Sequence, residues 1–169
     1  YRSFIPRAGA RIAGAWIAEP VDLKGGRAEV PLALDHSRLD GALDLSDARF
    51  AAYVSFSGSA LAKPLSLARA RIDGQLALSD TRIEGGVALA GSRLSELAFE
   101  ASAIGGPLDL TGAEIAGRLM LKSSRVDGRM SLAGARIFGA ALFDRATLWD
   151  EADFTNLEAA IDVAFVNGA

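Results

Sequence analysis

The sequence predicts an all-β solenoid in which 11-residue units pair into 22-residue coils. The first observation is an anchor residue, almost always aliphatic, that returns every eleven residues and shifts once by a single dropped residue: Ile17, Ala28, Leu39, Phe50, Leu61, Ile72, Ile83 and Leu94, then Ile104, Ile115, Val126, Ile137 and Leu148. The second is that Leu or Phe stands six residues after each anchor, or five after Leu94. A strict short period of this kind is typical of repeat proteins, whose units bury their apolar faces only against neighbouring units.

Each unit is expected to contain two very short strands. In the unit that begins at Ile115, Leu119 and Leu121 are two residues apart, as are Ser124 and Val126. A spacing of two places both members on one face of a strand. Glycines two residues past the anchor are expected to form corners, where a positive φ is tolerated: Gly41, Gly74, Gly85, Gly106, Gly117, Gly128 and Gly139. This glycine density, and prolines at one repeat position, exclude a helical interpretation of the repeat.

Segments with a small residue two before a large one, such as Ala48-Arg-Phe50, Ala70-Arg-Ile72 and Ala135-Arg-Ile137, resemble the signature of pentapeptide-repeat proteins. That resemblance implies a right-handed, parallel, quadrilateral β-helix with the small and large residues pointing inward. The sequence differs from the family by alternating steps of five and six residues. Residues 41–50 more closely resemble bacterial pentapeptide-like proteins labelled membrane-associated oxidoreductases, and the resemblance covers about residues 10–157.

Alternate units differ in composition, which predicts that two units form one coil. Leu67 should then stack on Leu45 and Leu89, and Phe56 on Leu34 and Leu78. One residue before these positions the side chains point outward. One set of units is polar there, with Asp22, Asp44, Asp109 and Asp153, and the other carries no charge, with Ala33, Ser55, Ala77, Ala98, Met120 and Leu142.

We expect three segments: an irregular N-terminal coil or cap over 1–16, the β-helix repeat domain over 17–154, and a C-terminal cap over 155–169. Thr155-Asn-Leu-Glu158 matches a capping box. The stripe of Leu157, Ile161, Ala164 and Phe165 then predicts a capping helix over 156–167, with Gly168 as its stop.

Composition excludes several function classes. Net charge is −3, from 18 basic and 21 acidic residues, so no strong field favours a nucleic-acid partner. The absence of Cys excludes disulfides and thiolate metal sites. No apolar run approaches the roughly 20 residues that a membrane helix needs, and no signal peptide is visible at Tyr1. We expect a cytoplasmic protein or a fragment of a longer one, with peripheral membrane association through a partner or a missing segment left open.

The polar residues do not form a recognisable catalytic set. His36, the single histidine, lies in Asp35-His36-Ser37, and residues adjacent in sequence do not make a triad. A metal site would need further ligands. Carboxylates one past the anchor follow an Arg by two residues, which predicts an exposed ion-pair ladder: Arg27/Glu29, Arg38/Asp40, Arg71/Asp73, Arg82/Glu84 and Arg125/Asp127. The arginine column Arg27, Arg49, Arg71 and Arg93 lacks the interleaved aromatics of single-strand binders.

The sequence therefore favours a non-catalytic structural or interaction module, with no cofactor, over an enzyme. The candidate interface is an outward strip that becomes larger and more apolar toward the C-terminus: Ala77, Ala98, Met120 and Leu142, with Phe138 at a nearby corner. The partner would be another protein or a second copy. Two alternatives remain: a DNA-mimicking, gyrase-binding protein of the pentapeptide type, which would need a strongly acidic surface, and the β-helical part of a larger membrane-associated enzyme.

Overall fold

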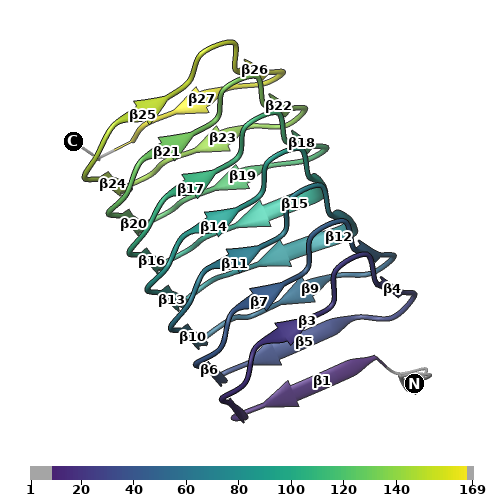
Figure 1. Cartoon of the computed structure of the whole chain (residues 1–169). Coiled ribbons are helices and arrows are strands. Elements are labelled where there is room, and N and C mark those ends of the chain that lie inside the picture. The colour runs from purple at the N-terminus through teal and green to yellow at the C-terminus, as the bar shows by residue number, and fades with distance from the viewer. Residues whose placement is uncertain (1–8, 167–169) are drawn as a thin grey trace.

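The computed structural model describes residues 9–166, and within them 27 short strands and no helix (Figure 1). The strands repeat in groups of four, and the four members of a group lie on four faces of a parallel solenoid with seven coils. Two faces are separate seven-stranded sheets. The other two belong to one 13-stranded sheet, because β12 (Arg71–Ala77) and β15 (Arg93–Ala98) continue around the corner between them.

Face 1 contains β2 (Trp16–Ile17), β6 (Arg38–Leu39), β10 (Ala60–Leu61), β13 (Arg82–Ile83), β16 (Ala103–Ile104), β20 (Arg125–Val126) and β24 (Thr147–Leu148). Face 2 contains β3 (Val21–Asp22), β7 (Leu43–Asp44), β11 (Leu65–Ser66), β14 (Val87–Ala88), β17 (Leu108–Asp109), β21 (Met130–Ser131) and β25 (Ala152–Asp153).

Face 3 contains β4 (Arg27–Ala28), β8 (Arg49–Phe50), the first parts of β12 and β15, β18 (Glu114–Ile115), β22 (Arg136–Ile137) and β26 (Glu158–Ala159). Face 4 contains β1 (Ala10–Ala13), β5 (Leu32–Asp35), β9 (Val54–Ser55), the last parts of β12 and β15, β19 (Leu119–Met120), β23 (Ala141–Leu142) and β27 (Val163–Ala164).

Strand register confirms that two units make one coil. Leu65 pairs with Leu43 on one side and Val87 on the other, a step of 22 residues each way. The ladder continues through Leu67, whose N–H donates to the carbonyl of Ala88. Leu67 therefore occupies the same position as Leu45 and Leu89 in the adjacent coils, and Phe56 by the same register follows Leu34 and precedes Leu78. Alternating polar and apolar residues thus become continuous columns along the rod.

The dropped residue is absorbed at one corner. Arg71 pairs with Arg93 and Ile72 with Leu94, but beyond the corner Gln75 pairs with Glu96, so the register shifts by one residue. Asp73 and Gly74 in one coil are therefore matched by Ser95 alone in the next. The flat faces on either side keep their parallel pairing because the deletion falls in the bend between them.

The interior is filled by these stacked columns. Leu45, Phe56, Leu78, Phe99 and Leu121 have no exposed surface. Burial of a side chain of this size is worth about 1.5–3 kcal/mol. Because the buried residues form one contiguous cluster from Leu34 to Phe143, the rod has one core that each coil extends.

Two corners in every coil contain a residue in the left-handed region. Six of these residues are glycines and eight are not: Gly14, Gly25, His36, Asp47, Gly58, Arg69, Asp80, Gly91, Ala101, Gly112, Ser123, Gly134, Arg145 and Asn156. They stand three residues before each anchor. A positive φ costs a residue with a Cβ roughly 1–2 kcal/mol, so the tight solenoid turn imposes this conformation on whatever residue falls there.

The glycines two residues past the anchor were predicted to lie at corners because a positive φ is tolerated there, and this reason is wrong. None of the seven has a positive φ. A Cβ on Gly41 would lie 2.4 Å from the carbonyl carbon of Glu19, and a Cβ on Gly128 would lie 2.5 Å from that of Gly106. These glycines are needed because consecutive coils approach too closely at this corner for a side chain.

One inward column carries hydroxyl groups that connect neighbouring coils. It consists of Ser37, Ser59, Thr81, Ser102 and Ser124, all buried. The Ser37 N–H donates to the Ser59 hydroxyl at 2.9 Å, and that hydroxyl donates to the Leu34 carbonyl at 2.7 Å. The opposite inward column is Ala48, Ala70, Ser92, Ala113 and Ala135. Ser92 is the exception in it, because its buried Oγ has no hydrogen-bond partner.

The predicted capping helix over 156–167 does not form in the part of that segment that the structure describes. β26 pairs with β22, and β27 pairs with β23, so the segment extends the solenoid. The edges of β22 and β23 offer unpaired main-chain groups, and pairing with them outweighs the local capping signal. Gly168, the predicted stop, lies outside the described residues. At the other end, β1 already pairs with β5 over four residues.

Candidate interaction surface

The structure places four of the five predicted interface residues in one column on face 4. Ala77 pairs with Ala98, Ala98 with Met120, and Met120 with Leu142, each on the next parallel strand. Leu76, Leu97, Leu119 and Ala141 precede them and are fully buried, so the column itself points outward. We call Ala77, Ala98, Met120 and Leu142 the face-4 strip.

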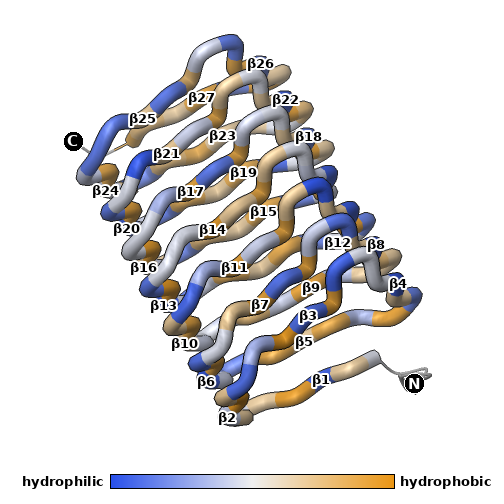
Figure 2. The backbone as a smooth tube through the Cα atoms, in the orientation of Figure 1, coloured by the Kyte–Doolittle hydropathy of each residue, from blue (hydrophilic) through white to orange (hydrophobic). Residues whose placement is uncertain are grey.

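The strip changes in height along the rod. Ala77, Met120 and Leu142 are half-buried, whereas Ala98 is only 3% exposed although it points outward. The strip therefore has a low half formed by two alanines and a high half formed by Met and Leu. Figure 2 shows the tube in orange shades along β19 and β23, with blue along β3, β17 and β25 on face 2.

Charged side chains flank the strip on both sides. On the side where the strands begin, the flanking positions are Gln75, Glu96 and Arg118, and Arg118 Nη2 lies 3.3 Å from Glu96 Oε1 in the preceding coil. On the side where the strands end, the equivalent positions are Ser79, Glu100 and Lys122. In the two coils before Ser79, the same position is occupied by Asp35 and Ser57. The side chains of both contact the outward hydroxyl of Ser55 on face 4, which shows that this position borders the face.

Glu100 and Lys122 are both exposed, and within the described residues neither forms an ion pair. Sequence inspection did not single them out, because the repeat pattern marks only the strand centres. Their register, one coil apart beside Ala98 and Met120, becomes visible once the 22-residue coil is established.

Phe138 does not join the strip. Its side chain is 52% exposed, and the guanidinium carbon of Arg136 lies 5.7 Å from its ring centroid. The ring lines an open hollow with Arg136, Leu157 and Ala160. It therefore belongs to the face-3 side of the corner.

Faces 1 and 3 carry the predicted ion-pair ladder. Four of the five expected pairs form: Arg38–Asp40, Arg71–Asp73, Arg82–Glu84 and Arg125–Asp127. The fifth, Arg27–Glu29, is absent from the pairs among residues 9–166. Further pairs connect adjacent coils, such as the bidentate contact of Arg69 with Asp47. The hydrogen bond from Arg69 lowers the pKa of Asp47, as expected for an acceptor that is stabilised in its charged form.

The aspartates of face 2 support the turns. Asp22, Asp44, Asp109 and Asp153 each accept a hydrogen bond from the main-chain N–H two residues later. Hydrogen bonds from the side chain and main chain of Ser46 lower the pKa of Asp44. These carboxylates therefore satisfy orphan backbone donors, which is the ordinary role of Asp in a turn.

The structure contains the predicted arginine column on face 3, and acidic side chains neutralise part of its charge. Arg27, Arg49, Arg71 and Arg93 pair in succession. Arg71 bonds Asp73, and Arg93 lies 3.1 Å from Glu114.

His36 occupies a left-handed corner with φ 49° and is exposed. A Cβ on Gly58 would lie 2.3 Å from His36 Nδ1, so the imidazole lies over the equivalent corner of the next coil. Ser37 points into the core and donates to the carbonyl of Asp35. The three adjacent residues thus have separate surroundings.

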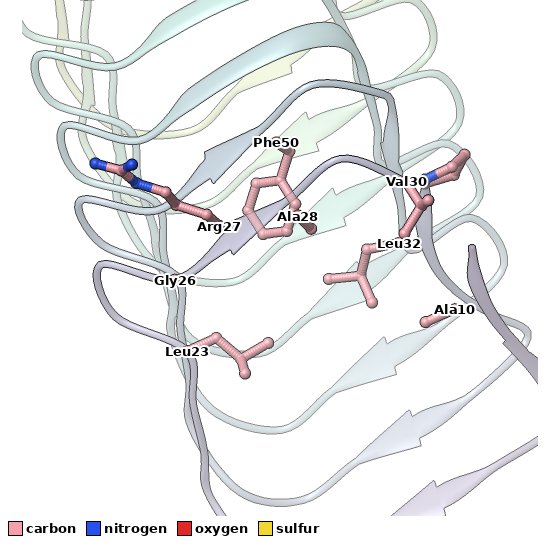
Figure 3. Close-up of a pocket in the computed structure, with 9 residues that line it drawn as sticks. Ala10, Leu23, Gly26, Arg27, Ala28, Val30, Leu32 and Phe50 are labelled. Atoms are coloured by element: carbon pink, nitrogen blue, oxygen red, sulfur yellow. The ribbon is translucent and has the colours of Figure 1, made fainter. Parts of the chain in front are cut away.

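An apolar hollow opens at the first coil (Figure 3). Leu23, Ala28, Leu32 and Phe50 line it, and the Arg27 guanidinium points away from it. Gly26 and Ala28 are smaller than their counterparts Ala48 and Phe50, so the hollow is the incompletely filled start of the core. The described residues that line it do not supply the converging polar groups that orient a small-molecule ligand.

In residues 9–166 no group of three or more His, Asp or Glu side chains is arranged to hold a metal ion. None of the described residues forms a helix that could cross a membrane. In comparisons with known proteins, no protein-family model matches the sequence, and no curated protein matches it.

Proposed function

We propose that this protein is a non-catalytic interaction module that binds a protein partner through the face-4 strip. The observation that carries the proposal is the uninterrupted apolar column from Ala77 to Leu142, which contrasts with the carboxylates and ion pairs of the other faces. Contiguous apolar patches with a polar rim often mark protein interfaces.

We further propose that it is a pentapeptide-repeat-like β-helix. Four strands in each coil, two left-handed corners in each coil and inward small-x-large pairs support this relationship. The gyrase-binding, DNA-mimicking alternative is less well supported, because most acidic groups on faces 1 and 3 are neutralised by arginines and those of face 2 hold turns. The alternative of a β-helical part of a larger membrane-associated enzyme has no catalytic constellation among the described residues to support it.

The test is the double substitution Met120→Arg with Leu142→Arg, which should abolish partner binding while the circular dichroism spectrum stays that of a β-solenoid. The matched control is Ala88→Arg with Ser131→Arg, which adds the same charge at outward positions of face 2. Affinity capture from the source organism followed by mass spectrometry, and light scattering, would compare the two variants. Equal binding by both variants would show that face 4 is not the interface.

A further inference from the structure

We propose that the partner of the face-4 strip is a second copy of this protein, related by a two-fold axis that runs parallel to the strands and passes between β15 and β19. This inference rests on the proposed function, because it uses the same surface and names its occupant. Closed two-fold contacts bring one patch against itself, so the patch must be self-complementary in shape and charge.

The shape of the strip meets this requirement. Rotation about the proposed axis places β15 of one copy opposite β19 of the other, and β12 opposite β23. Ala98 then faces Met120 of the second copy, and Ala77 faces Leu142 of the second copy. Each large side chain in the high half meets a small one in the low half, and each contact occurs twice. Interdigitation of large and small residues is how packed sheets fill the space between them.

The charges that flank the strip are also self-complementary under this axis. The same rotation brings each flank against itself, so Glu96 faces Arg118 of the second copy. The intramolecular pair of Glu96 and Arg118, 3.3 Å apart, would thereby become part of a group of four alternating charges. On the opposite flank, Glu100 faces Lys122 of the second copy, which supplies each with the partner it lacks within its own copy. Ser79 faces Asp144 of the second copy, a hydroxyl donor opposite a carboxylate.

The other simple two-fold arrangement is disfavoured by the same residues. An axis parallel to the rod would place each strand opposite its own copy and exchange the flanks. Arg118 would then face Lys122, and Glu96 would face Glu100. Juxtaposed like charges suppress wrong partners and wrong registers, so the charge pattern selects the axis along the strands.

The contact is expected to be small. Four coils at a spacing of about 4.8 Å cover about 19 Å of the rod, which places the interface at the low end of the size range of specific complexes. Association should therefore be weak, and sedimentation must be followed to high protein concentration.

Charge exchange tests the axis directly. Glu100→Lys alone, or Lys122→Glu alone, opposes like charges twice in each dimer and should weaken association about five- to tenfold. The variant carrying both Glu100→Lys and Lys122→Glu should associate as the wild type does, because the opposite charges are restored. Lys63→Glu is the control, since Lys63 is exposed at a corner away from face 4; it should leave the dimer constant unchanged.

Cross-linking provides an independent measurement, because the sequence has no native cysteine. An equal mixture of Ala77→Cys and Leu142→Cys proteins should form a dimer with a short bis-maleimide. Either protein alone should not, because the like positions lie about three coils apart across the axis, or about 14 Å along the rod.

The outcomes separate this inference from the proposed function. A wild-type protein that stays monomeric at all concentrations overturns the second copy as partner, while capture of another protein that Met120→Arg with Leu142→Arg abolishes would keep the proposed function. Stronger association of Lys122→Glu would overturn the axis in favour of the one parallel to the rod. A dimer that is insensitive to the Met120→Arg, Leu142→Arg double substitution overturns the second copy as the partner of face 4, and partner capture that is equally insensitive overturns the proposed function as well.

Discussion

The main-chain N–H of Thr81 donates a hydrogen bond to the hydroxyl of Ser102, one coil further along the rod, at 3.2 Å. Ser102 in turn donates to the carbonyl of Leu78. One side chain thus satisfies a donor and an acceptor from the preceding coil, inside a largely apolar core. The hydroxyl column holds adjacent coils together by direct hydrogen bonds as well as by packing.

Ser102→Ala should destabilise the protein by about 1–3 kcal/mol, because it leaves a buried N–H without its partner. Ser92→Ala should be neutral or slightly stabilising, because it removes a buried hydroxyl that has no partner from a column of alanines. Urea unfolding, followed by circular dichroism, measures both midpoints. Equal midpoints for the two variants would contradict the distinction between the columns.

Two glycines should respond differently to the same substitution. Gly112→Ala should cost about 1–2 kcal/mol, the strain of a left-handed φ, because no atom lies within 4 Å of the new Cβ. Gly128→Ala should cost clearly more, because its Cβ would lie 2.5 Å from the main chain of Gly106 and the coils would have to separate. Thermal melting distinguishes the two. A smaller loss for Gly128→Ala would mean that the coils adjust freely at that corner.

Leu78→Asp should unfold much of the rod, whereas Ala77→Asp should not. Leu78 is fully buried between Phe56 and Phe99, and an unpaired carboxylate there costs several kcal/mol. Ala77 is its neighbour in sequence but points outward. Limited proteolysis and circular dichroism provide the comparison, and resistance of Leu78→Asp equal to that of the wild type would show that Leu78 is not internal.

Asp40 should remain charged to unusually low pH. Hydrogen bonds from Arg38 and then from the Trp16 indole lower its pKa below the ordinary value of about 3.9. Because the pKa of Asp40 is lower in the folded protein, its carboxylate stabilises the fold at any pH above the pKa that it has in the unfolded protein. This contribution is lost as the pH falls through the folded-state pKa. In a Trp149→Phe background, Trp16 fluorescence should follow that titration, and Asp40→Asn should remove it. A midpoint at the ordinary pKa would contradict the contact.

The 22-residue length of the coil was predictable because the pairing between strands of adjacent coils repeats with the period of the sequence. Leu67 takes the position that Leu45 has in the preceding coil, and Phe99 takes the position that Leu78 has in its preceding coil. The left-handed corners were not predictable from composition. Ala101 and Arg145 occupy them, and neither residue type signals a positive φ, since closure of the turn imposes the conformation.

The C-terminal error has a different cause. Leu157, Ile161 and Phe165 are spaced for a helical stripe, but Phe165 also stands 22 residues after Phe143. The Phe143 and Phe165 rings stack with centroids 4.7 Å apart. The repeat period was the stronger signal, because an existing strand edge favours continuation of the sheet over a new helix.

The strip and its flanking charges were only half visible in the sequence. Met120 and Leu142 stand out because they are large where earlier units have alanine. That Glu100 and Lys122 lie one coil apart on the same flank of the strip is known only once the coil register is known, and the linear sequence pattern does not show it. Phe138 was expected at a corner near the strip, and the structure places its ring beside Arg136.

The bend at Ser95 shows that a coil of such a rod can differ in residue number while the stacking of the coils continues. The coil that passes through Ser95 is one residue shorter at this corner than the coil before it, and the pairing of the flat faces on either side is unchanged, so the corner accommodates a change of one residue without disturbing the columns. Duplication of a whole 22-residue segment would lengthen the rod by about 4.8 Å and leave every column continuous. The protein can therefore evolve as a molecular spacer, whose length changes in fixed increments while the chemistry of each side is inherited.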